Sequence, residues 1–112
     1  MATTLTDRAF RDKCDAIYKA VLARLDQEDP DDVEAELSAG VVKIKTRSGK
    51  TYVLNHQAPI FEVWYAAGDR AWHFQYQDSQ WIDPRNGDEL AQVLGATISR
   101  EVGRSIVFAL PG

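Results

Sequence analysis

The apolar residues of this chain change from a helical to a strand period near residue 30. Over residues 7–26 they recur at spacings of four, three, four and four, which places them on one face of a helix: Phe10, Cys14, Ile17, Val21 and Leu25. Thr6 is a suitable N-cap for this helix, and Pro30 requires that the helix end before it. From Asp32 onward polar and apolar residues alternate, as in a strand with one buried face.

This alternation predicts a run of six short strands. The first has Val33, Ala35 and Leu37 towards a core and carboxylates on its other face. The other five are expected at residues 41–45, 51–57, 60–66, 71–76 and 81–82. A second helix is expected over residues 88–102, ended by Gly103, and the apolar residues 106–108 then pack along it or add an edge strand.

The order helix, antiparallel strands, helix predicts an α+β two-layer sandwich. Both the N- and C-terminal helices are expected on one face of the antiparallel sheet, which leaves the other face open to solvent. A length of 112 residues with 45% hydrophobic residues suits a single globular domain over residues 1–112.

Composition limits the cellular compartment and the kinds of partner that we expect for this protein. The single cysteine, Cys14, excludes an internal disulfide framework, lies on the apolar helix face and is expected in the core. No apolar run approaches the ~18 residues of a membrane span, and the N-terminus lacks a signal-peptide pattern, so a cytoplasmic protein without a membrane partner is expected. A sequence pI near 5.1 argues against nucleic acid as a partner.

Seven of the eleven residues from Asp26 to Glu36 are carboxylates and none is basic, whereas the rest of the chain has a net charge of +3. Carboxylate oxygens are ligands for Mg²⁺, Ca²⁺, Mn²⁺ and iron. Side chains on one strand face lie about 7 Å apart, so Asp32, Glu34 and Glu36 cannot all bind one ion directly. Several weak sites, docking of a basic partner and a merely solvated acidic turn all remain open.

A second candidate surface is the outer face of the sheet. Alternation places Phe61, Val63 and Tyr65 on one face of the fourth strand and Glu62 and Trp64 on the other. An exposed Trp64 near Asn55 and Gln57 is typical of an interaction hot spot, although a tryptophan can also simply cover a sheet.

Signatures of conventional catalysis are absent from the sequence. His56 and His73 lack metal-ligand spacing, and the sequence has no local signature of a catalytic triad, phosphate loop or zinc site. We therefore do not expect an enzyme.

Several segments together resemble the frataxin family, especially its bacterial CyaY branch. They are residues 40–44, 52–59, 62–66, 73–74, 81–82 and 85–90, and they include the family pattern at Asn55, Gln57, Pro59, Trp64, Tyr65 and Ala66. The resemblance covers nearly the whole chain, in order. It implies the frataxin fold and a cytoplasmic role in iron–sulfur cluster assembly.

The resemblance also implies residues, cargo and partners. Iron, as Fe²⁺ or Fe³⁺, would bind weakly along an acidic ridge, and other divalent cations would substitute for it. The ridge corresponds to Asp26, Asp29, Asp31, Asp32, Glu34 and Glu36, with Glu28 as a local addition. The implied partners are an IscS-type cysteine desulfurase, which the protein would regulate as iron donor or sensor, and the cluster scaffold; Asn55, Gln57 and Trp64 would form the partner-binding sheet surface.

A monomer with iron-dependent oligomers is expected. The rival interpretations are a weak ferroxidase or iron-storage protein and a metal-independent acidic adaptor for the desulfurase. The chain departs from the family pattern in the last turns of the first helix and in the fifth strand: Lys19, Ala23, Arg24 and Gln75. These departures predict a shorter ridge, and Pro30 is expected to alter the geometry of its turn.

Overall fold

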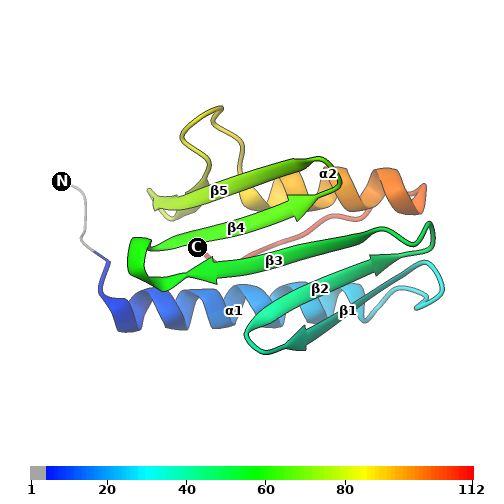
Figure 1. Ribbon diagram of the computed structural model, residues 1–112, viewed down its shortest axis with the longest axis horizontal. Coiled ribbons are helices and arrows are strands. Elements are labelled where there is room, and N and C mark those ends of the chain that lie inside the picture. The colour runs from blue at the N-terminus through cyan, green and yellow to red at the C-terminus, as the bar shows by residue number, and fades with distance from the viewer. Residues whose placement is uncertain (1–4) are drawn as a thin grey trace.

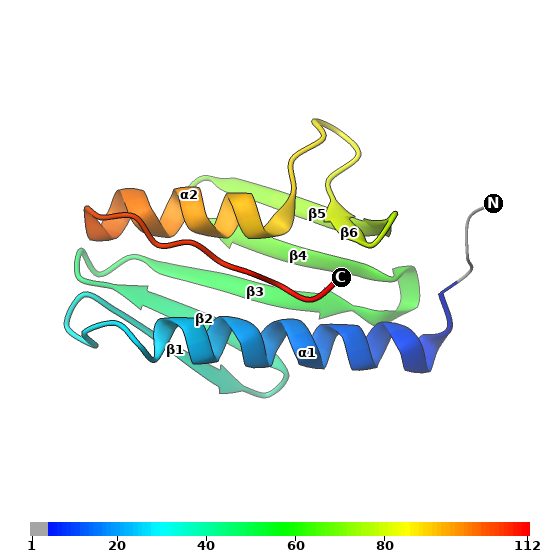
Figure 2. The same ribbon diagram turned by 180° about the vertical axis from the view of Figure 1, so that it is seen from behind.

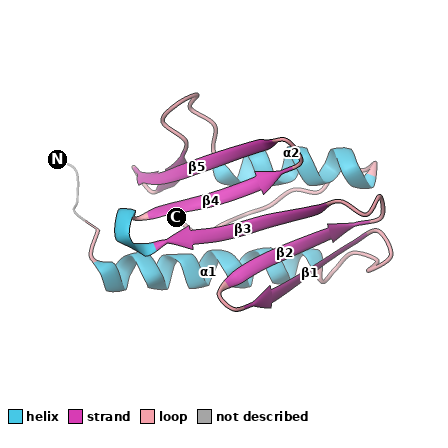
Figure 3. Cartoon of the chain, viewed as in Figure 1, coloured by secondary structure: helices cyan, strands magenta, loops and turns pink. Residues whose placement is uncertain are grey.

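The computed structural model describes residues 5–112 and contains two α-helices and a six-stranded sheet (Figures 1 and 3). The elements are α1 (Asp7–Leu25), β1 (Val33–Ser38), β2 (Val41–Thr46), β3 (Thr51–Gln57), the 3₁₀ helix η1 (Ala58–Ile60), β4 (Glu62–Ala67), β5 (Arg70–Gln77), β6 (Gln80–Ile82) and α2 (Leu90–Val102). Within residues 5–112, no helix is both long and apolar enough to cross a membrane.

The strands form an antiparallel meander in the order β1 to β6, and both helices cover the same face (Figures 1 and 2). This arrangement confirms the predicted α+β two-layer sandwich with one open sheet face. After α2 the chain runs back between the two helices (Figure 2). One hydrophobic cluster joins the helices, the inner sheet face and this returning segment.

Helix α1 forms as its sequence predicts. The Thr6 hydroxyl accepts a hydrogen bond from the Ala9 amide at 3.1 Å and so caps the first turn. The predicted apolar face is buried throughout, and Cys14 is only 1% exposed. Burial raises the pKa of the Cys14 thiol to about 12, so this group is an inert part of the core.

The fourth strand does not begin at residue 60 as predicted. Residues 58–60 form η1, and Phe61 takes a left-handed conformation with φ = 54°. Its ring stacks on Phe10 of α1, with centroids 5.1 Å apart. Phe61 therefore reaches the core from a turn rather than from the strand that carries Val63 and Tyr65, because contact with the helix outweighs the cost of its backbone conformation.

Two further boundaries differ from the sequence prediction. The second helix begins at Leu90 rather than residue 88, because the Glu89 side chain accepts hydrogen bonds from the Ala91 and Gln92 amides and acts as the N-cap. In β1 the inward alternation weakens along the strand: Val33 is buried, whereas Leu37 is 51% exposed because β1 extends beyond the core.

The segment after α2 packs along the helices and adds no strand. Ile106 and Phe108 are buried, and the Ser99 hydroxyl contacts both the amide nitrogen and the carbonyl oxygen of Ile106, at 2.8 and 3.2 Å. On the other side, Arg24 of α1 donates a hydrogen bond to the Val107 carbonyl at 3.0 Å. We call residues 104–108 the return segment, since they join both helices.

Candidate metal and partner surface

The acidic segment, residues 26–36, runs from the end of α1 through a turn into β1. The Asp29 carbonyl accepts hydrogen bonds from the amides of Asp32 and Val33, and the Asp29 side chain accepts one from the Asp31 amide at 2.9 Å. The backbone of the turn is thus fixed by its own hydrogen bonds. The seven carboxylates predicted to bind metal then fall into three different settings.

The first setting is a pair of carboxylates already bound by arginines. Glu28 accepts from Arg24 at 2.8 Å and from Arg104, and Asp32 pairs with Arg47 and with Arg104 at 3.0 Å. Their side chains are only 13% and 15% exposed. Hydrogen bonds from Arg24 and then Arg104 hold the pKa of the Glu28 carboxyl below its usual value. This pair is therefore neutralised within the protein.

The second setting is the outer face of the β1–β2 pair. Glu34 lies opposite Lys45, and Glu36 lies opposite Lys43. Opposite charges in such cross-strand positions contribute roughly 0.2–1 kcal/mol each. The strand part of the acidic segment thus faces two lysines and is less negative than its own residues suggest.

The third setting holds Asp26, Asp29 and Asp31, which are all exposed at the end of α1 and in the turn. No ion pair to these three appears among residues 5–112. The local negative charge of the segment is therefore concentrated here.

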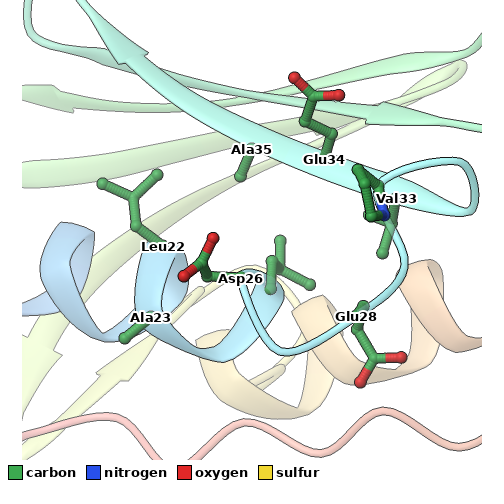
Figure 4. A pocket seen from close by; sticks show the side chains of 9 residues that line it. Leu22, Ala23, Asp26, Glu28, Val33, Glu34 and Ala35 are labelled. Carbon is green, nitrogen blue, oxygen red and sulfur yellow. The ribbon is translucent and has the colours of Figure 1, made fainter.

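A groove of about 320 Å³ separates the end of α1 from β1 (Figure 4). Asp26, at the end of α1, and Glu34, in β1, lie on its two sides, and apolar residues such as Leu22 and Val33 also line it. In Figure 4 the carboxyl groups of Glu34 and Glu28 point in opposite directions. Across the described residues, no three of the carboxylate, histidine and cysteine side chains are arranged to hold one metal ion.

The open sheet face carries the predicted partner-binding residues. Trp64 is half-buried on that face, as alternation predicts, with Asn55 directly opposite it on β3 and His73 opposite it on β5. The indole stacks on the His73 imidazole, with centroids 4.3 Å apart and planes at 13°. Gln57 lies opposite Glu62 in the neighbouring cross-strand row. The three predicted residues therefore share one continuous patch.

Glu62 organises this patch. Its two carboxylate oxygens accept hydrogen bonds from Trp64 Nε1 at 2.8 Å and from Gln75 Nε2 at 3.0 Å. Burial raises the pKa of Glu62, but the hydrogen bonds from Gln75 and Trp64 outweigh it, so the pKa lies below its usual value. The carboxylate stays ionised and fixes the indole. Gln75, a departure from the family pattern, here supports the tryptophan.

Asp83 is a buried carboxylate that supports the strand carrying His73. It is completely buried and accepts hydrogen bonds from the His73 amide at 3.1 Å and from the Arg85 amide at 2.9 Å. The Arg85 guanidinium also binds it, at 2.8 Å, and this contact lowers the pKa of Asp83 to about 2. The loop before α2 is thereby tied to β5.

The two histidines lie on opposite faces of the sheet. His73 belongs to the open face, whereas His56 points inward and its Nδ1 lies 3.0 Å from the Tyr18 hydroxyl. Both are therefore engaged with neighbouring side chains, which agrees with the reading that they are not a metal pair.

Sequence reasoning missed two groups of functional neighbours. His73 and Gln75 could have been found, because the alternation that places Glu62 and Trp64 on the open face also places these two β5 residues there. Arg104 carries no such signal: it is 76 residues from Glu28 in the sequence, and only the return segment brings it there.

Comparison with known proteins places the chain among frataxins. Residues 3–104 match the sequence profile of the frataxin-like domain. An iron–sulfur cluster assembly protein CyaY from Cupriavidus taiwanensis is 36% identical over 94 residues, which cover 84% of each chain. The frataxin structure from Psychromonas ingrahamii has a TM-score of 0.84 at 24% identity and covers 93% of this chain and 98% of its own. A trimeric yeast frataxin from Saccharomyces cerevisiae, complexed with ferrous iron, has a TM-score of 0.70 at 24% identity, with 93% and 92% covered.

Proposed function

The chain belongs to the frataxin-like family, and we propose that it binds iron weakly and delivers or senses it during iron–sulfur cluster assembly. The observation that carries this proposal is the exposed set Asp26, Asp29 and Asp31, which no ion pair among the described residues neutralises. The name of the Cupriavidus relative and the ferrous complex of the yeast protein support the same role.

Iron is cargo in this proposal, and its binding is electrostatic. The absence of a three-ligand cluster among residues 5–112 means that each ion would contact one or two carboxylates and keep much of its water. Asp26 and Glu34, on the two sides of the groove beside α1, extend the exposed set towards β1. Ca²⁺ and Mn²⁺ would compete for the same oxygen ligands.

We propose an IscS-type cysteine desulfurase as the partner that the protein regulates, with the cluster scaffold as a further partner. The acidic segment would dock a basic surface of the desulfurase, and Asn55, Gln57 and Trp64 would supply shape and hydrogen bonds on the open face. Because iron and partner would use overlapping carboxylates, iron occupancy would change docking. The proposed setting is the cytoplasm, with a monomer that associates further when iron is bound.

A metal-independent adaptor is the second candidate, and one observation favours it. Across residues 5–112 no three side chains are arranged to hold one metal ion, so the exposed carboxylates Asp26, Asp29 and Asp31 are equally suited to pair with arginines of a partner. We do not propose an enzyme. A ferroxidase would consume oxygen stoichiometrically on Fe²⁺ addition, and an oxygen electrode would detect that.

The deciding experiment measures desulfurase activity and anaerobic Fe²⁺ binding for matched variants. One variant carries Asp26→Asn, Asp29→Asn and Asp31→Asn. Its control makes the same charge change at the exposed residues Asp12, Asp15 and Asp69. Lower Fe²⁺ affinity and a lost iron response of the desulfurase in the first variant alone would support the proposal. Unchanged Fe²⁺ binding with lost desulfurase binding would favour the adaptor.

A further inference from the structure

One arginine occupies the centre of the acidic segment. Arg104 donates from Nε to Glu28 at 3.1 Å and from its NH1 nitrogen to Asp32 at 3.0 Å, so a single guanidinium bridges both carboxylates. Its own charge stays partly accessible, since its side chain is 45% exposed. The contact joins the return segment to the turn between α1 and β1.

The backbone holds Arg104 in that place from both sides. Before it, Gly103 ends α2 with φ = 83°, a left-handed conformation that favours glycine. After it, Ile106 is buried, and its amide donates to the Ser99 hydroxyl while its carbonyl accepts from the same group. The guanidinium is thus presented by a short, anchored turn rather than by a free tail.

We propose that Arg104 is a built-in competing cation that decides which carboxylates of the acidic segment can accept a metal ion. This inference rests on the proposed iron-binding function. Arg104 holds Oε1 of Glu28 and Oδ2 of Asp32, while Arg24 and Arg47 hold the other oxygen of each carboxylate. While Arg104 bridges the two, neither has a free oxygen, and iron is confined to Asp26, Asp29, Asp31 and the strand glutamates. A cation that recruits Glu28 or Asp32 must first displace the guanidinium.

Displacement couples the metal to the return segment. A cation that replaces Arg104 removes the two contacts that hold this residue to the turn between α1 and β1, so metal binding would loosen the return segment. If cation binding weakens the Arg104 contacts by some factor, then by thermodynamic reciprocity the loss of those contacts strengthens cation binding by the same factor. Arg104 is therefore a residue that sets affinity and stoichiometry without touching the ion.

The test is a double-mutant cycle on anaerobic Fe²⁺ affinity, measured by calorimetry on the full chain. Arg104→Gln is expected to raise affinity by about fivefold or more, the lower end of typical coupling between sites. In a Glu28→Gln, Asp32→Asn background, the same change is expected to alter affinity by less than about twofold, since the withheld carboxylates are gone. Arg100→Gln, an exposed position on the last turn of α2, is the charge-matched control.

A general effect of removing positive charge would overturn the inference. It would give equal gains in both backgrounds and an equal gain for Arg100→Gln. A fold check by circular dichroism accompanies each variant. If a variant fails to fold, hydrogen exchange of the unaltered protein tests the displacement instead. The amides of residues 105–108 are expected to exchange faster when Fe²⁺ is present. Unchanged or slower exchange would contradict the displacement of Arg104.

The cycle also separates this inference from the proposed function. Suppose that substitution of Asp26, Asp29 and Asp31 leaves the Fe²⁺ affinity unchanged, whereas Arg104→Gln raises it only when Glu28 and Asp32 are present. The exposed carboxylates are then not the iron site, but the competition between Arg104 and the metal ion is supported. If the exposed carboxylates matter and Arg104→Gln has no effect, the competition is wrong and the proposed function stands.

Discussion

The indole of Trp64 lies flat on the imidazole of His73, with ring centroids 4.3 Å apart. Its one N–H is already donated to Glu62. A partner that docks on the open sheet face therefore meets a tryptophan with a fixed orientation and no spare donor. We infer that Trp64 contributes apolar and π contacts to a complex, while hydrogen bonds come from neighbours such as Asn55.

Glu62→Gln should release the Trp64 indole. Trp64 and Gln75 donate to different oxygens of Glu62, and glutamine replaces one of these oxygens with an NH2 group, so one of the two donors would face another donor. We expect a loss of about 1–2 kcal/mol in the free energy of unfolding, together with a shifted and broadened Trp64 indole N–H resonance. Glu36→Gln, on the same sheet face, is the control and should leave that resonance unchanged.

Asp83 should make stability depend on acid pH. Its pKa is lowered from 3.8 to about 2 in the folded protein, so its contribution is complete above the unfolded value and is lost as the pH falls from about 4 to 2. The shift corresponds to about 2 kcal/mol. Asp83→Asn should destabilise the protein at pH 7 and differ progressively less from the unaltered protein in urea unfolding towards pH 2.

The matched control for Asp83→Asn is Asp69→Asn at an exposed loop position. A stability difference between Asp83→Asn and the unaltered protein that stayed constant from pH 7 to pH 2 would contradict the linkage.

Ca²⁺ should raise the melting temperature through the exposed carboxylates. A cation at about ten times its Kd adds about 1.4 kcal/mol, which is several degrees for a domain of this size. NaCl at equal ionic strength should do less, because salt screens the arginine pairs of Glu28 and Asp32 as well as the repulsion between carboxylates. Differential scanning calorimetry of the Asp26, Asp29 and Asp31 triple variant should show no specific Ca²⁺ response.

Ser99→Ala should loosen the return segment. The Ser99 hydroxyl bonds both backbone groups of Ile106, so its removal leaves them without this partner inside a partly buried seam. We expect a loss of about 1–2 kcal/mol in the free energy of unfolding and faster amide exchange at residues 105–108. Ser105→Ala, at an exposed position, should change neither quantity.

Local patterns predicted most of the architecture. Helical spacing from Phe10 to Leu25 and the alternation around Trp64 each report which face is buried, and the structure confirms both. The pattern was wrong at Phe61, where a left-handed turn replaces the start of a strand because packing on Phe10 decides the conformation. Strand alternation alone cannot distinguish a strand residue that faces the core from a residue that reaches the core through a left-handed turn.

The candidate site was less predictable because the charges in the sequence do not show which basic side chain pairs with each carboxylate. The sequence shows seven clustered carboxylates, but their settings depend on contacts across the fold. Glu34 and Glu36 meet lysines through strand register, and Glu28 and Asp32 meet Arg104 only because the chain returns between the helices. Long-range pairs of this kind leave no periodic trace in a single sequence.

The return segment also has a consequence for how the protein is made. A ribosome synthesises α1 first, yet Glu28 and Arg24 receive their partners Arg104 and Val107 only after 76 and 83 further residues. Until then the seam between the helices is open and the buried faces of Ile106 and Phe108 do not exist to fill it. A chain that lacks the return segment is therefore expected to expose the apolar surface that Ile106 and Phe108 cover, and exposed apolar surface of this kind favours chaperone binding or aggregation over folding.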